Sequence, residues 1–285
     1  MKKLIVILCS VIVLAASCSK DDSDVDIRHY TPSTAYMSRL EVPKVLSTGT
    51  QFIQHSTVVN GDSMMTYCLE YDLQKLHSRW VAFRFDGLTR LVNSTRNNPW
   101  ADDPKLASKY QIGNGTFQGG GVRGHICASH DRRYSQEAND QTFYMTNMTP
   151  MNYDFNGSYW TKFESYVQDL GRSTSFADTL YIVKGGTIRD GQTKGTIKSS
   201  GGKQVVIPKY YFIALLKLKG GTYKAIGFLI EHKDYGREAT MTDVKDAAMT
   251  IDKLEEQTAI DFFPNLPDNI ETSVEKSYST SDWNL

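Results

Sequence analysis

Arg123-Gly124-His125 is followed at fixed distances by Asn156 and Glu164, and these residue types together could form a small metal-assisted site. Imidazole titrates close to neutral pH, which suits a general base. An amide oxygen and a carboxylate suit a magnesium ion that keeps most of its waters. Taken singly, His125 reads as structural, Asn156 as a helix-start residue and Glu164 as an exposed carboxylate. The chemistry therefore depends on whether the fold brings these residues together.

A strand and a helix must position these residues. His125 is expected on a strand entered through residues 119–121, three glycines that permit positive φ. Residues 156–170 have helical spacing, with Asp154 able to cap the start and Gly171 expected as the stop. The apolar stripe of this helix is Trp160, Phe163, Val167 and Leu170. Asn156 and Glu164 are about two turns and roughly 80° apart, so both can edge one side of the helix.

The rest of the chain predicts one α+β domain over residues 46–285. Strand patterns occur at 52–59, 64–71, 80–85, 141–146, 179–183, 210–218 and 223–230. Helical patterns occur at 88–93, 249–259 and within 266–285. No break in composition separates the two halves, so we expect a mixed or antiparallel central sheet with helices packed against it.

The formal net charge of the 285 residues is zero. The net charge therefore does not indicate nucleic-acid binding, and any basic surface that faces phosphate must be local. Arg123, Arg132 and Arg133 gather around Asp131 and form such a local basic cluster, although clusters of this kind are also common on ordinary solvated surfaces.

The first residues are typical of a targeting segment. Lys2 and Lys3 precede an apolar run from Leu4 to Ala16, which is too short to span a membrane. Residues 14–18, Leu-Ala-Ala-Ser-Cys, resemble a bacterial lipoprotein processing site. We therefore expect residues 1–17 to be a signal peptide and Cys18 to be lipidated. The alternative is an ordinary secretory signal with an incidental cysteine.

Residues 18–45 are expected to be a lipid anchor followed by a flexible linker. The acidic tract at 21–24 resembles the surface-export signal of Bacteroidetes lipoproteins, and a solvated tether is the alternative. The expected location is the cell envelope, anchored to the outer membrane, with the leaflet left open. Cys68 and Cys127 both fall in expected strands, and the sequence leaves open whether they pair.

The spaced set of residues around His125 resembles the active-site segment of the DNA/RNA non-specific endonucleases of the ββα-metal (His-Me finger) type. The matching features, in order, are Arg123-Gly124-His125, Asp131-Arg132, Thr142-Phe143, Thr146-Asn147-Met148, Pro150, Asn156, Trp160 and Glu164. Arg96, Trp100 and Asp103 resemble the arginine-containing loop that precedes this segment. The likeness covers roughly residues 50–283, and its strength lies in the joint spacing.

The resemblance implies a role for each residue in hydrolysis of a phosphodiester bond. His125 would be the general base that activates water. Arg96 and Arg123 would contact the phosphate and stabilise charge in the transition state. Asn147 would support the site by hydrogen bonding.

The resemblance also implies the metal. Asn156 would be the one direct protein ligand of Mg²⁺, and Glu164 would hold a metal-bound water. Mn²⁺ could replace Mg²⁺ at an oxygen site. DNA and RNA would bind through their backbone phosphates, and the lipid on Cys18 would hold the protein at the membrane.

Two positions depart from the family pattern. Val122 stands where the family usually has an aspartate before Arg-Gly-His, and Gln168 stands where some members have another arginine. The first change removes an orienting carboxylate, and the second removes a cation that would hold phosphate.

The resulting hypothesis is a lipid-anchored, Mg²⁺-dependent endonuclease that cuts DNA and RNA to 5′-phosphate ends. One alternative is an envelope lipoprotein that binds nucleic acid, or another polymer, without cutting it, and a second is a plain envelope scaffold. The sequence leaves open the oligomeric state and the preference between DNA and RNA.

Overall fold

A seven-stranded antiparallel sheet organises the part of the chain that the computed structural model describes, residues 34–285. Its strands are β1 (Thr50–Val59), β2 (Asp62–Asp72), β3 (His77–Phe85), β6 (Thr179–Gly186), β9 (Tyr210–Lys219), β10 (Thr222–Glu231) and β11 (Ala248–Met249). They lie in the order β1-β2-β3-β6-β9-β10-β11, and every neighbouring pair is antiparallel. The expected α+β class is confirmed, and the sheet is antiparallel throughout.

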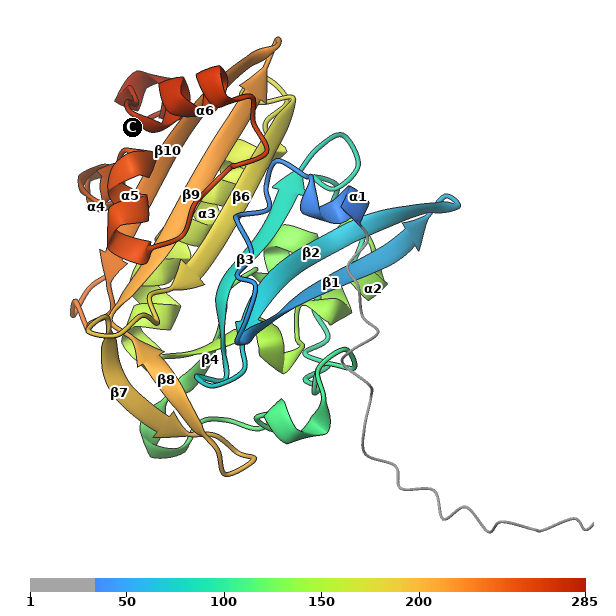
Figure 1. Cartoon of the computed structure of the whole chain (residues 1–285), viewed down its shortest axis with the longest axis vertical. Helices are drawn as coiled ribbons and strands as arrows, with labels where there is room; N and C mark the ends of the chain where they lie inside the picture. The colour runs from blue at the N-terminus through green and yellow to red at the C-terminus, as the bar shows by residue number, and fades with distance from the viewer. Residues whose placement is uncertain (1–33) are drawn as a thin grey trace, which may run out of the picture.

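The sheet buries both of its faces. Along β6, Leu180 and Ile182 pack into one core with helix α3 (Trp160–Arg172), while Tyr181 and Val183 pack into a second core with helix α5 (Ile251–Thr258). Figure 1 shows α3 behind the sheet, and α5 and α6 (Asp268–Glu275) in front of it. Burial on both sides explains why β6 and β9 read as continuous apolar runs.

Smaller elements complete the described chain. The remaining helices are α1 (Thr34–Met37), α2 (Gln136–Gln141) and α4 (Met241–Asp246). Two further strand pairs are β4 (Val122–His125) with β5 (Met148–Met151), and β7 (Thr193–Lys198) with β8 (Gln204–Pro208), which extends below the main sheet in Figure 1. No helix within residues 34–285 is long and apolar enough to cross a bilayer.

Two hairpins of the main sheet turn at residue pairs that contain glycine. Asn60 and Gly61 both have positive φ between β1 and β2, and Gly220 and Gly221 do the same between β9 and β10. This backbone twist matches that of the flanking strands, which fixes the register of each hairpin.

The predicted strand at 141–146 is wrong. This segment is the end of α2, a turn and a short 3₁₀ helix at Met145–Asn147. Its backbone hydrogen bonds are mostly local, such as Phe143 N–H to Asp140 C=O at 3.0 Å. The apolar alternation reflects Phe143 and Met145, which are both buried, and the backbone between them makes only an isolated parallel bridge with Ala101.

Two helix predictions also need correction. Residues 87–90 form a hydrogen-bonded turn, and residues 91–93 are irregular. Helix α3 does not stop at Gly171 but continues to Arg172. The glycine is needed there for the helix to pack against the sheet. A Cβ on Gly171 would overlap the ring of Phe85 on β3, so its absence lets the helix lie close to the sheet.

The predicted flexible linker is too long at its C-terminal end. Val42 is 1% exposed and belongs to the core beneath α5. The side-chain amide of Asn265 donates to the carbonyls of Met37 and Arg39, at 2.9 and 3.0 Å. Residues from about 37 onward therefore pack on the domain. The predicted signal peptide and Cys18 lie outside the described residues.

Cys68 and Cys127 are both buried as free thiols. Cys68 lies in the core under α5, whereas Cys127 lies in the core under α3, on the other side of the sheet. The pairing that the sequence left open does not form in this structure.

Candidate active site

The β4–β5 pair places His125 at the edge of a small antiparallel ribbon. His125 lies opposite Met148 in the register. A Cβ on Gly124 would overlap the side chain of Met151, so glycine at this position leaves room for that side chain beside the ribbon.

Aromatic rings enclose the imidazole of His125. Its centroid lies 5.3 Å from that of Trp100 and 4.9 Å from that of Phe143, and the residue is only 8% exposed. Its Nε2 has no hydrogen-bond partner among the described residues. Burial, and then the nearby guanidinium groups of Arg96 and Arg123, lower the pKa of His125 to about 3. The imidazole is therefore neutral, the form that can accept a proton.

Asn147 braces the chain just after His125. Its side-chain amide donates to the carbonyls of Cys127, at 2.8 Å, and Thr142, at 2.7 Å. Its Oδ1 accepts the Cys127 N–H at 2.8 Å, and its backbone carbonyl accepts the Ile126 N–H at 3.0 Å. Asn147 is fully buried, so it supports the site through the backbone and does not face the cavity.

A π-helical turn at Phe155–Tyr159 leads into α3 and carries Asn156. The predicted cap by Asp154 is wrong, since Asp154 makes no capping bond. Asn152 does this instead, because its Oδ1 accepts the N–H groups of Asp154 and Phe155, at 2.9 and 3.2 Å. π-Helical turns are often found at functional positions.

One cavity of about 550 Å³ brings the predicted residues together. Arg96, Arg123, His125, Asn156 and Glu164 all line it, and Asn147 is the one predicted site residue that does not. The two guanidinium groups rest on aromatic rings, Arg123 at 3.7 Å from the Trp100 centroid and Arg96 at 5.2 Å from that of Phe143. These contacts hold two cations at the same opening as the imidazole.

Sequence reasoning missed Lys184. This residue on β6 is fully buried, and its Nζ lies 2.8 Å from Oδ2 of Asp131, which is also fully buried. Burial lowers the pKa of Lys184, but the carboxylates of Asp131 and Glu164 outweigh it and leave the pKa above its usual value. The sequence did contain a signal, since Lys184 directly follows the apolar residues Leu-Tyr-Ile-Val. A lysine at the end of a buried strand needs an acidic partner, which here is Asp131.

Both departures from the family pattern line the cavity. Val122 is partly exposed at its wall, and Gln168 faces it from α3. The Gln168 amide donates to Oδ1 of Asp131 at 3.0 Å. Gln168 therefore keeps a hydrogen bond to the carboxylate that pairs with Lys184, but it brings no positive charge to the cavity.

The donor set of the cavity fits a hard divalent cation. Asn156 contributes a neutral amide oxygen and Glu164 a carboxylate, and such oxygens are the ligands that Mg²⁺ takes in proteins. Burial raises the pKa of Glu164 to about 7, although the positive charge of Lys184 acts to lower it. A cation beside it would offset the cost of keeping this carboxylate charged.

Comparison with known proteins identifies the family of the chain. Residues 48–269 match the family model described as DNA/RNA non-specific endonuclease. The chain is 27% identical over 212 residues to the mitochondrial nuclease EXOG of Xenopus laevis, covering 71% of this chain and 58% of that protein. It is 29% identical over 216 residues to a protein of Nostoc sp. named nuclease, covering 73% and 75%. The chain thus spans little more than half of the EXOG protein.

A solved structure shares the fold. A chain from the crystal structure of the EndoG/EndoGI complex superposes with a TM-score of 0.63 at 18% identity, covering 84% of this chain and 95% of that one. Human mitochondrial endonuclease G is 26% identical over 221 residues, covering 72% of this chain and 69% of that protein.

Proposed function

Because the chain belongs to the DNA/RNA non-specific endonuclease family, we propose that it hydrolyses phosphodiester bonds of both DNA and RNA to 5′-phosphate ends, with the help of a divalent cation. The observation that carries this proposal is the single cavity that gathers His125, Asn156, Glu164 and two arginines. These are the groups that the reaction needs within reach of one phosphate.

His125 is the proposed general base. A water molecule in line with the scissile bond gives a proton to the neutral imidazole as its oxygen attacks phosphorus. In the free protein a pKa of about 3 makes His125 a weak base. A bound phosphate anion neutralises part of the charge of Arg96 and Arg123, and this raises the basicity of His125 when substrate is present.

Arg96 and Arg123 stabilise the phosphate as negative charge develops on its oxygens. Arg96 is exposed and Arg123 partly exposed, so both can reach a polymer that lies across the opening. Contacts to backbone phosphates carry no base information, which accounts for cutting without sequence preference.

Asn156 and Glu164 would hold the cation, Asn156 directly and Glu164 through water. Mg²⁺ is the proposed ion, and Mn²⁺ is an alternative for the same oxygens. When bound, the cation supplies positive charge at the scissile phosphate and the leaving oxygen. Asn147 keeps the backbone after His125 in place through its buried hydrogen bonds.

Anchoring of this enzyme to the outer membrane through a lipid on Cys18 is part of the proposal. It is supported by the Leu-Ala-Ala-Ser-Cys string and by the acidic residues that follow it. The animal relatives carry names that place them in mitochondria, which says nothing about this chain. Protease shaving of intact cells tests exposure at the surface, since a periplasmic protein would be protected.

The second candidate function is binding of nucleic acid without cutting. Val122 and Gln168 favour it, because both departures lie in the cavity wall. The intact set of His125, Asn156 and Glu164 favours the enzyme.

Cleavage assays separate the two functions. The purified full-length protein is incubated with plasmid DNA and with RNA, in Mg²⁺ and in EDTA, beside His125→Ala and Asn156→Ala. We expect cleavage of both substrates in Mg²⁺ alone, with a loss of about 10²–10⁴-fold in His125→Ala. Asp169→Asn, an exposed residue of the same helix as Glu164, is the control and should cut normally. Binding without Mg²⁺-dependent cleavage would refute the enzyme.

A further inference from the structure

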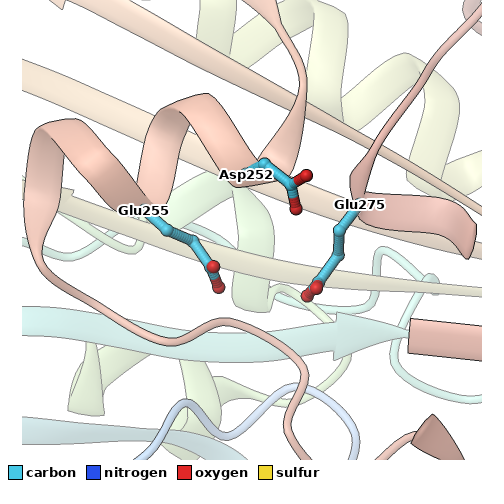
Figure 2. A group of neighbouring side chains, drawn as sticks. All are labelled: Asp252, Glu255 and Glu275. Carbon is cyan, nitrogen blue, oxygen red and sulfur yellow. The ribbon is translucent and has the colours of Figure 1, made fainter. Parts of the chain in front are cut away.

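Three carboxylates meet at the front of the sheet, away from the cavity. Asp252 and Glu255 project from α5, and Glu275 is the last residue of α6. One oxygen from each of the three lies within 4.8 Å of the others. Figure 2 shows the carboxylates of Glu255 and Glu275 directed toward each other, with Asp252 beside them.

Glu275 provides a second observation, independent of this clustering. The residue is only 8% exposed, and its Oε1 is buried without a hydrogen-bond partner among the described residues. By contrast, Oε1 of Glu255 accepts the N–H of Phe262 at 2.7 Å. A buried carboxylate oxygen with no donor is costly, and Figure 2 shows the Glu275 carboxylate aimed into the cluster.

The surroundings add negative charge. Within residues 34–285 no lysine, arginine or histidine forms an ion pair with Asp252, Glu255 or Glu275. The neighbouring Asp261 is also acidic, and its partner Lys44 lies 3.6 Å away from it. Glu275 also stands at the C-terminal end of α6, where the helix dipole is negative.

The same crowding appears in the pKa values. Burial, and then the neighbouring carboxylates, raise the pKa of Glu255 to about 7 and that of Glu275 to about 8. The cluster thus lacks positive charge, and either a cation or a shared proton would supply it.

We propose that Asp252, Glu255 and Glu275 form a structural Ca²⁺ site that ties α6 to α5. Three carboxylate ligands suit a hard cation, with water completing the coordination, because Asp252 and Glu255 are partly exposed. Mg²⁺ is usually held by one or two carboxylates and keeps several waters, so a set of three carboxylates favours Ca²⁺.

The site is separate from the catalytic cavity. α5 packs on the face of the sheet opposite α3, and none of the three residues lines the cavity. Occupation of the site should therefore stabilise the fold without taking part in hydrolysis.

The test measures Ca²⁺ binding by equilibrium dialysis and thermal unfolding of the full-length protein. Asn156→Ala is the background for dialysis, so that ions in the catalytic cavity do not obscure the count. We expect Glu275→Gln to weaken one Ca²⁺ site by at least about tenfold. Asp252→Asn should do the same. Glu256→Gln, an exposed neighbour on α5, is the matched control and should bind normally.

Thermal unfolding and activity complete the test. In the Asn156→Ala background, a hundredfold excess of Ca²⁺ over its Kd should raise the Tm of the protein and of its Glu256→Gln variant by about 5 °C, but not that of its Glu275→Gln variant. Glu275→Gln should keep its nuclease activity in Mg²⁺, which shows that it folds. The proposal is overturned if Glu275→Gln and Asp252→Asn bind Ca²⁺ as the control does. It is also overturned if the Asn156→Ala protein shows no Ca²⁺-dependent rise in Tm, which would favour a shared proton.

Discussion

Lys184 and Asp131 form a fully buried ion pair, with 2.8 Å between Nζ and Oδ2. The same carboxylate accepts the backbone N–H of Ala128 at 2.9 Å and the side-chain amide of Gln168 at 3.0 Å. Asp131 therefore joins β6, the segment that follows His125 and helix α3. The last two line the cavity, and the ion pair fixes them to the main sheet.

Breaking this pair from one side should be severe. Lys184→Met leaves a buried carboxylate without its cation, so we expect the free energy of unfolding to fall by about 3–5 kcal/mol in urea titrations. Removing the second charge as well, in Lys184→Met with Asp131→Asn, should recover much of that loss. A single variant that loses less than about 1 kcal/mol would show that the pair is not a principal support.

Asn147→Ala should weaken both the fold and the reaction. The substitution leaves the Cys127 N–H and two buried carbonyls without partners, which should lower the free energy of unfolding by about 2–4 kcal/mol. Because the affected backbone follows His125 directly, kcat should fall more than KM rises. A variant with reduced stability but unchanged kcat would limit Asn147 to a structural role.

Stability should decline in acid because of His77. Burial lowers the pKa of His77 to about 4, below its unfolded value of 6.5, and its ring nitrogens bond to Ser78 C=O at 2.7 Å and to the Thr149 hydroxyl at 2.6 Å. The neutral form is favoured in the fold, so its stabilisation is complete above pH 6.5. It is lost as pH falls towards 4, by up to about 3 kcal/mol.

Chemical denaturation between pH 4 and 7 measures this effect. His77→Gln does not titrate, so the slope of unfolding free energy against pH in this window should fall by up to about 1.4 kcal/mol per pH unit. His125 contributes in the same direction, so some slope should persist. An unchanged slope in His77→Gln would exclude His77 as a source.

Arg96 and Arg123 should determine how binding depends on salt. With cleavage disabled by His125→Ala, the affinity for a short DNA duplex is measured by fluorescence anisotropy over a range of salt. Each lost phosphate contact should reduce the slope of log K against log salt by about 0.9. Arg96→Gln and Arg123→Gln should each show this reduction, whereas the exposed Arg189→Gln, outside the cavity, should not.

Much of the fold could be predicted from local patterns. The six long strands of the main sheet and the α3 stripe could be predicted because alternation and helical spacing directly reflect which side chains face a core, whereas the two-residue β11 could not. The error at 141–146 has the same origin, since Phe143 and Met145 are buried by turns packed on Trp100 and the neighbouring core. The β7–β8 ribbon was missed because β7 is largely exposed and β8 is a run of only five residues that ends in proline.

The candidate site depended on joint spacing more than on any one residue. No single residue among His125, Asn156 and Glu164 indicates catalysis by its type or local context. The structure brings all three into one cavity. Lys184 and the true cap, Asn152, were missed because their partners depend on tertiary contacts. No spacing rule pairs a lysine on β6 with an aspartate in the loop after β4.

All residues that line the cavity belong to the segment that joins β3 to β6, and this has a consequence for how the protein matures. β3 and β6 are neighbours in the sheet, yet residues 86–178, which include β4, β5 and α3, lie between them in sequence. Joining two strands across so long a loop is entropically costly, so we expect the main sheet, on which this segment packs, to be completed late in folding. A newly made chain would then carry every reactive side chain but remain harmless to nucleic acid until its last folding steps.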